Sequence, residues 1–126
     1  MKHRKATLLL ALMCVVVGTI WLIADSSGPN VDTLDDVKLS AAADQLVLRV
    51  PPGTVPQGEW PSEMRRIKPL GVRIGAEGVY LKMQSFFATE KGIFIHNTNS
   101  SFRPEKDGDP SYRPLRGKIY WYEIKG

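Results

Sequence analysis

The side chains that could carry chemistry gather in one long segment near the C-terminal end, residues 97–117. Its three carboxylates include Glu105 and Asp109, and His96 precedes the segment directly. Two carboxylates can hydrolyse a glycosidic bond, and a histidine can exchange a proton near neutral pH. However, the sequence contains neither Gly-x-Ser-x-Gly nor His-Glu-x-x-His, and catalytic groups normally occur as sets. We therefore expect His96 to be an ordinary surface residue at a strand end.

The same segment is better suited to binding than to catalysis. It has 21 residues, which is long for a connection between two strands, and long loops often carry binding residues. Arginine and tyrosine are enriched at interface hot spots because they combine contact area with polar reach. We predict that the binding residues are Arg103, Asp109, Tyr112 and Arg113. Asp109 is also expected to accept backbone hydrogen bonds within a turn.

The composition argues against metals, cofactors and nucleic acid. The only cysteine is Cys14, and His96 is the only histidine after residue 24. One histidine without a cysteine does not make an ordinary zinc site, so the sequence predicts no metal site and no cofactor. Residues 25–126 hold 14 positive charges, which is 17 less the three at residues 1–5, against 13 negative charges. A net charge of +1 gives no general attraction to nucleic acid.

The N-terminal segment predicts a membrane anchor. After a basic start at residues 1–5, residues 6–24 run for 19 positions without a charge. As a helix this run spans about 28 Å, close to the thickness of a bilayer core. Basic residues stay in the cytoplasm, so we expect a single-pass inner-membrane protein that contacts the lipid bilayer through residues 6–24 and is otherwise periplasmic. A cleaved signal peptide and a lipoprotein attached through Cys14 are the alternatives.

The elements that must position the loop follow this anchor. Residues 25–44 are interpreted as a linker or stalk, with a short helix over 34–43 as an alternative. Residues 51–69 contain five prolines and predict a crossing loop with a helical turn at 62–67. A three-residue turn at 90–92, with Gly92 left-handed, is expected to join two strands. The strands are predicted at 45–50, 72–74, 79–83, 86–89, 92–95 and 118–124.

The last strand indicates how the core is built. Large side chains occupy both of its faces, which is typical of a strand inside a sheet. We expect Ile119, Trp121, Phe94 and Trp60 to be in the core. The predicted fold class is mainly β: an N-terminal transmembrane helix, then a small antiparallel sheet or partly open barrel of about five strands at residues 45–126.

These features together predict a membrane-anchored, periplasmic, non-catalytic module that binds a protein of the cell envelope. An accessory envelope subunit or an immunity-type inhibitor would fit, because an anchor raises the local concentration near membrane partners. The alternative is a small envelope enzyme that acts on a cell-wall or glycan substrate with Glu105, Asp109 and His96.

Overall fold

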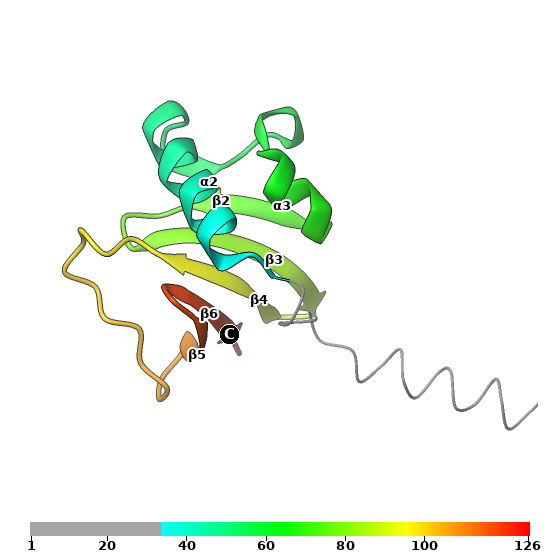
Figure 1. The fold of residues 1–126 in the computed structure, drawn as a ribbon. Helices are drawn as coiled ribbons and strands as arrows, with labels where there is room; N and C mark the ends of the chain where they lie inside the picture. Colours follow the sequence, from blue (N-terminus) through cyan, green and yellow to red (C-terminus); the bar gives the residue numbers. More distant parts are fainter. Residues whose placement is uncertain (1–33) are drawn as a thin grey trace, which may run out of the picture. The chain divides into compact units, whose positions relative to one another are not determined.

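The computed structural model describes residues 34–126, which form one antiparallel sheet with two helices on one of its faces (Figure 1). The sheet has six strands in the order β1-β2-β3-β4-β6-β5 and is not closed. The elements are α2 (Asp36–Arg49), β1 (Gly53–Thr54), the 3-10 helix η2 (Gln57–Glu59), α3 (Ser62–Ile67), β2 (Gly71–Ile74), β3 (Gly78–Phe86), β4 (Thr89–His96), β5 (Ser111–Arg116) and β6 (Ile119–Ile124). The predicted mainly β, antiparallel class is confirmed.

The predicted anchor at residues 6–24 lies outside the described residues. Within residues 34–126, no helix is both long and apolar enough to cross a bilayer.

Helix α2 corrects the prediction of a strand at residues 45–50. The helix begins after Asp35, whose carboxylate accepts a hydrogen bond from the Lys38 backbone amide at 3.1 Å. Leu39, Ala43 and Leu46 then repeat at helical spacing and are buried. Packing of this face on the sheet outweighs the strand-like pattern around Val47. Since Leu39 and Ala43 belong to the core, the folded unit also begins well before residue 45.

The main core lies between the helices and the sheet. Met64 of α3 and the buried face of α2 pack against the alternate residues of β2, β3, β4 and β6 that point to this side. Trp60 packs against the same core and donates its indole N–H to the Val55 carbonyl at 3.0 Å. The core residues are Leu39, Ala43, Leu46, Val55, Met64, Val72, Ile74, Val79, Leu81, Ile93, Ile95 and Ile119.

The β3–β4 hairpin turns at a different place from the one predicted. Phe86 pairs with Thr89, so Phe87 and Ala88 form the turn and Glu90 and Lys91 lie within β4. Phe87 adopts the left-handed conformation at φ +54°. Gly92 is inside β4 and is required there for another reason, because a Cβ atom would overlap the Leu81 carbonyl oxygen.

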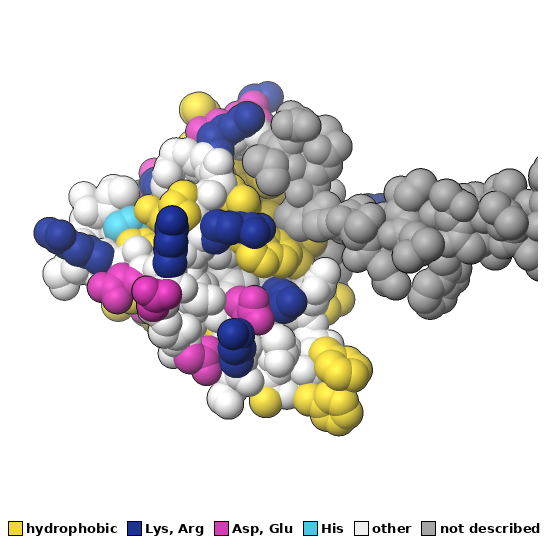
Figure 2. Space-filling model, turned by 90° about the horizontal axis from the view of Figure 1, so that it is seen from below, with side chains coloured by type: hydrophobic (Ala, Val, Ile, Leu, Met, Phe, Trp, Pro, Cys, Tyr) yellow, Lys and Arg dark blue, Asp and Glu magenta, His cyan; other side chains and the backbone are white. Residues whose placement is uncertain are grey.

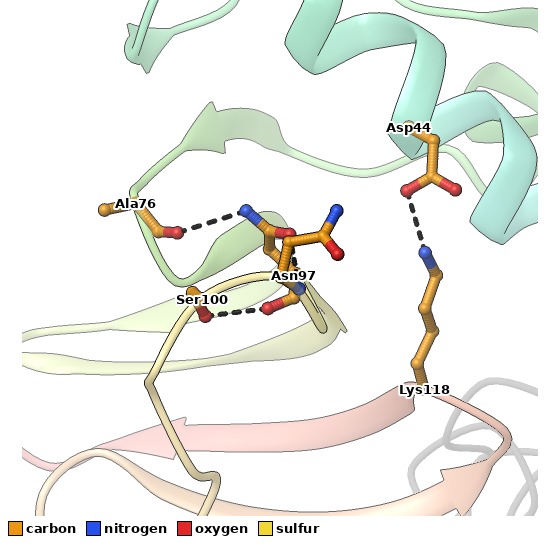
Figure 3. A network of polar contacts seen from close by, with 6 residues as sticks. Asp44, Ala76, Asn97, Ser100 and Lys118 are labelled. Carbon is orange, nitrogen blue, oxygen red and sulfur yellow. Dashed lines mark hydrogen bonds and ion pairs between the residues drawn. The ribbon is translucent and has the colours of Figure 1, made fainter.

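The last strand is interior to the sheet, as predicted, and pairs with β4 and β5. Ile119 and Phe94 are buried, which confirms their predicted place in the core. Trp121 packs against the core but stays partly exposed. Helix α2 is joined to the turn before β6 by an ion pair of 2.7 Å between Asp44 and Lys118 (Figure 3).

Strand β5 lies inside the segment that we predicted to be one long loop. The true connection from β4 is therefore Asn97–Pro110, 14 residues, and β5 is the sheet edge. Tyr112 turns its backbone N–H away from β6, toward the Glu105 carbonyl at 2.8 Å. Pro114 is the next residue whose backbone nitrogen points away from β6. Proline has no N–H, so the pairing with β6 loses no hydrogen bond there. The edge therefore offers few free groups for another strand.

The burial of α2 generates the first prediction. Leu46→Ala removes a fully buried side chain and should lower the free energy of unfolding by about 3 kcal/mol. The matched control is Leu48→Ala, two residues along the same helix and 87% exposed, which should change it by less than about 0.5 kcal/mol. Urea denaturation of both variants measures this difference. Equal losses would contradict the helical register.

Candidate functional site

The structure separates the four predicted binding residues. Arg103 and Asp109 are exposed in the loop, and Arg113 is exposed on β5. Asp109 accepts a backbone hydrogen bond, but from the distant Lys125 amide at 2.7 Å rather than within its own turn. Tyr112 is only 5% exposed, so its side chain is not on the surface where we expected it. Since successive side chains of a strand alternate, Tyr112 and Arg113 lie on opposite faces of the sheet.

Tyr112 belongs to an aromatic cluster on the face of the sheet that the helices leave free. The cluster consists of Tyr80, Phe94, Tyr112 and Tyr122, all buried. Phe94 lies at the centre, with ring centroids 4.7 Å from Tyr80 and 5.0 Å from Tyr112. Phe102 of the loop covers it at 6.0 Å in an edge-on arrangement. Tilted and edge-on pairs of this kind stabilise beyond the area they bury, so the cluster acts as a second core.

A polar layer satisfies the hydroxyl groups of this cluster. The hydroxyls of Tyr80 and Tyr112 are 2.7 Å apart. Tyr122 donates to Glu90 Oε2 at 2.7 Å, and Arg73 donates to the same oxygen at 2.6 Å. The Arg73 guanidinium also lies over the Tyr80 ring, 4.2 Å from its centroid. One carboxylate oxygen thus joins β2, β4 and β6.

The environment of this layer shifts several pKa values. Burial by itself would raise the pKa of Glu90, but the hydrogen bonds from Arg73 and Tyr122 outweigh it and hold the pKa below its ordinary value. Burial would lower the pKa of Arg73, and the bond to Glu90 reverses this effect, so that pKa is raised. Burial raises the pKa of Tyr80 and Tyr122 far above the usual range of a phenol. At neutral pH this layer is an ion pair among neutral phenols.

The loop before β5 is held in place by backbone contacts. His96 is at the end of β4, as predicted, but it is partly buried, and its Nε2 lies 2.8 Å from the Phe102 carbonyl oxygen. Asn97 reaches the Ala76 carbonyl at 3.5 Å, and Ser100 donates to the Asn97 carbonyl at 2.7 Å (Figure 3). The loop therefore forms an ordered cover over the aromatic cluster.

The opposite face of β5 and β6 carries an open pocket, which we call the Trp121 pocket. Strand register places Lys91 beside Glu123 and Glu123 beside Ser111, with Trp121 beside Arg113 in the next row. The pocket has a volume of about 510 Å³. Its lining residues are Lys91, Lys106, Ser111, Tyr112, Arg113, Trp121 and Glu123. None of these residues belongs to α2 or α3, and the indole is left partly exposed.

This arrangement can recognise an anion next to an apolar group. Lys91, Lys106 and Arg113 supply three positive charges against the single negative charge of Glu123. An exposed tryptophan offers a large contact area that is rigid and partly apolar. Sequence reasoning found Arg113, but it placed Lys91 in a turn and Trp121 in the core. The alternation of Trp121 with Glu123 on one face was the signal that pointed to a partly polar surface.

Two other hollows are less suited to a ligand. A groove of about 480 Å³ lies between α2 and the segment η2–α3, but Arg49 and Arg65 already donate to the Glu59 and Gly58 carbonyls there. In a smaller pocket of about 250 Å³, Arg73 and Glu90 are already paired with each other. Figure 2, which views the face away from the helices, shows positive and negative side chains interspersed rather than gathered in one patch.

Comparison of the chain with protein-family models, with curated proteins and with solved structures finds no match.

The shared carboxylate generates the second prediction. Because the folded-state pKa of Glu90 is depressed, its contribution to stability is complete above the unfolded-state pKa, about 4.3, and is lost as the pH falls through the folded value. Glu90→Gln should therefore lower the free energy of unfolding by about 1 kcal/mol at neutral pH and flatten its fall in acid. Urea denaturation between about pH 6 and pH 3 measures both effects. Glu105→Gln, at an exposed carboxylate, is the control and should leave the dependence of the unfolding free energy on pH as in the wild type. If Glu90→Gln also leaves that dependence unchanged, Glu90 is not the stabilising carboxylate.

Proposed function

We propose that this chain is a non-catalytic protein-binding module, held by its N-terminal segment at the periplasmic face of the inner membrane. In this proposal, the Trp121 pocket receives an acidic segment of an envelope protein. The observation that carries the proposal is a partly exposed tryptophan among three cations on a part of the sheet that the helices leave uncovered.

The pocket has the size and composition of a recognition site. Its volume of about 510 Å³ falls within the ordinary range for ligand pockets, although it is open rather than enclosed. Tryptophan and arginine are the side chains most enriched among residues that dominate binding energy. The side chains of Trp121 and Arg113 are neighbours across the β5–β6 pair. One partner residue could therefore contact both.

Charge favours an acidic partner. The pocket has a net charge of +2, three cations less Glu123, whereas residues 25–126 have a net charge of only +1. A local excess of charge speeds the association of an oppositely charged partner and repels partners of like charge. The guanidinium of Arg113 can bind a carboxylate through two parallel hydrogen bonds. Nucleic acid fits less well, because the rest of the domain lacks the extended positive surface needed to track phosphates.

The mode of binding is docking on side chains rather than addition of a strand. Strand addition needs free backbone groups along an edge. At β5 the Tyr112 amide is already bonded to Glu105, and Pro114 has no amide to offer. A partner is therefore expected to contact the face of the sheet and the loop. Arg103 and Asp109, both exposed in the loop, remain predicted binding residues outside the pocket lining.

A small envelope enzyme remains the alternative function. It would need Glu105, Asp109 and His96 to converge on a substrate. In the structure His96 contacts the Phe102 carbonyl, and Asp109 accepts the Lys125 amide. None of these three residues lines the Trp121 pocket.

The third prediction tests the pocket by site-specific crosslinking. A photoreactive amino acid placed at Ser111, which lines the pocket and carries no charge, should capture one specific partner when the full chain is in native membranes. The same photoreactive residue placed at Arg66, exposed on α3, is the control and should capture none. Lys106→Glu should reduce the Ser111 adduct by about tenfold or more, because it places a like charge against an acidic partner.

Salt provides an independent check of the same contact. Raising the ionic strength should weaken the adduct, since exposed charges are screened within about 8 Å at physiological salt and over shorter distances above it. An adduct of equal yield from Ser111 and Arg66, or one that Lys106→Glu leaves unchanged, would exclude the pocket as the docking site.

A further inference from the structure

The β3–β4 hairpin ends in two exposed aromatic side chains. Phe86 is 74% exposed and Phe87 is 92% exposed. Their rings contact each other edge-on, with centroids 4.5 Å apart. Figure 2 shows a hydrophobic group that projects from the margin of the domain. We call Phe86 and Phe87 the hairpin tip.

The backbone at the hairpin tip gives a second, independent observation. Phe87 has φ +54°, a conformation that glycine and asparagine adopt readily and that a bulky residue rarely adopts. Such a residue costs free energy, and Phe87 recovers little of it, since its side chain is almost wholly in solvent. Folding alone therefore does not account for a phenylalanine at this position.

We propose that the hairpin tip inserts into the interfacial region of the same bilayer that anchors the chain. This inference rests on the proposed function and extends it with a second membrane contact. Aromatic side chains are typical of protein segments that bury an apolar face at the level of the headgroups. Lys91, two residues into β4, and Lys125, next to the residue that contacts Ala88, add positive charge near the tip for anionic lipid.

The length of chain outside the described residues keeps the domain near the membrane. Only nine residues, 25–33, separate the apolar run 6–24 from the first described residue, Leu34. Fully extended they reach about 30 Å at most. A domain of this length has a radius of gyration of about 12 Å, so the tether holds it within roughly one diameter of the surface. Insertion of the tip is then an intramolecular event at high effective concentration.

The shape of the hairpin tip favours lipid over a protein partner. Phe86 ends β3, and Phe87 begins the two-residue turn. Neither phenylalanine lines any of the three pockets described above. Protein hot spots normally sit at the centre of a patch, surrounded by contacts that exclude water. A fluid interface requires no complementary surface, so two projecting rings are sufficient there.

The test uses the full chain in vesicles of equal parts phosphatidylethanolamine and phosphatidylglycerol. In a Cys14→Ser background, Ala88→Cys carries an environment-sensitive fluorophore at the tip. Ala76→Cys is the matched control, exposed in the turn at the opposite end of β3. Quenching by nitroxide-labelled lipid should be several-fold stronger at position 88 than at position 76. Equal quenching at the two positions overturns the proposal. A tip that binds a protein instead of lipid would give this result, because the vesicles contain no partner protein.

A paired variant separates insertion from folding. Phe86→Ser combined with Phe87→Asn removes both rings and places at position 87 a residue that tolerates positive φ. It should keep or raise the thermal midpoint while the quenching at position 88 falls to the level at position 76. Quenching that persists in this variant also overturns the proposal.

A flotation assay after a carbonate wash measures separately whether the N-terminal segment holds the chain in the bilayer. A chain that floats but shows no difference between positions 88 and 76 refutes the tip and leaves the proposed function standing. A chain that the wash releases refutes the anchor, and both proposals fail with it. The crosslink from Ser111 tests the Trp121 pocket itself and is read independently of both results.

Discussion

The fold depends on the burial of the second face of the sheet, which helices α2 and α3 do not cover. Helices α2 and α3 cover only one face, so the second face must exclude water with its own side chains. It does so with the aromatic cluster around Phe94 and with the loop that brings Phe102 over it. Tyrosine hydroxyls buried in such a layer need partners. Glu90 accepts the hydrogen bond of Tyr122, and Arg73 donates to the same carboxylate oxygen.

This second core determines what the other face of the sheet can offer. Tyr112 is fixed in the aromatic cluster, and β5 is thereby held as the edge strand beside β6. The alternation of side chains then forces Arg113 onto the opposite face, next to Trp121. Helix α2 contacts the β5–β6 turn, where Asp44 pairs with Lys118, but neither α2 nor α3 lines the Trp121 pocket. The indole therefore packs against the core and stays partly exposed. The Trp121 pocket is therefore a consequence of where the helices end.

The elements that sequence reasoning predicted well carry a local signal. The β2–β3 hairpin and β6 show the alternation and turn residues of strands, and both are where we expected them. For helix α2, the sequence predicts a short helix at 34–43 only as an alternative and assigns residues 45–50 to a strand. Apolar residues also occupy the outer side of the helix, notably Val37 and Leu48, and they hide the helical period. The turn at Phe87 was missed because glycine normally fills a left-handed position and Gly92 is nearby. The Trp121 pocket could not be predicted, because strand pairing brings its residues together from β4, the loop, β5 and β6.

The hairpin tip and the Trp121 pocket lie toward the same end of the sheet. Phe86 pairs with Thr89, and Lys91, two residues further along β4, is already part of the pocket lining. A tip held in the headgroup region would therefore bring the pocket close to the bilayer surface. A partner segment that reaches it would be one close to the membrane, where anionic lipid competes for the same lysines. In that arrangement selectivity would fall mainly on Trp121 and Arg113, because an indole and a bidentate guanidinium distinguish a protein carboxylate from a diffuse negative surface better than lysine does.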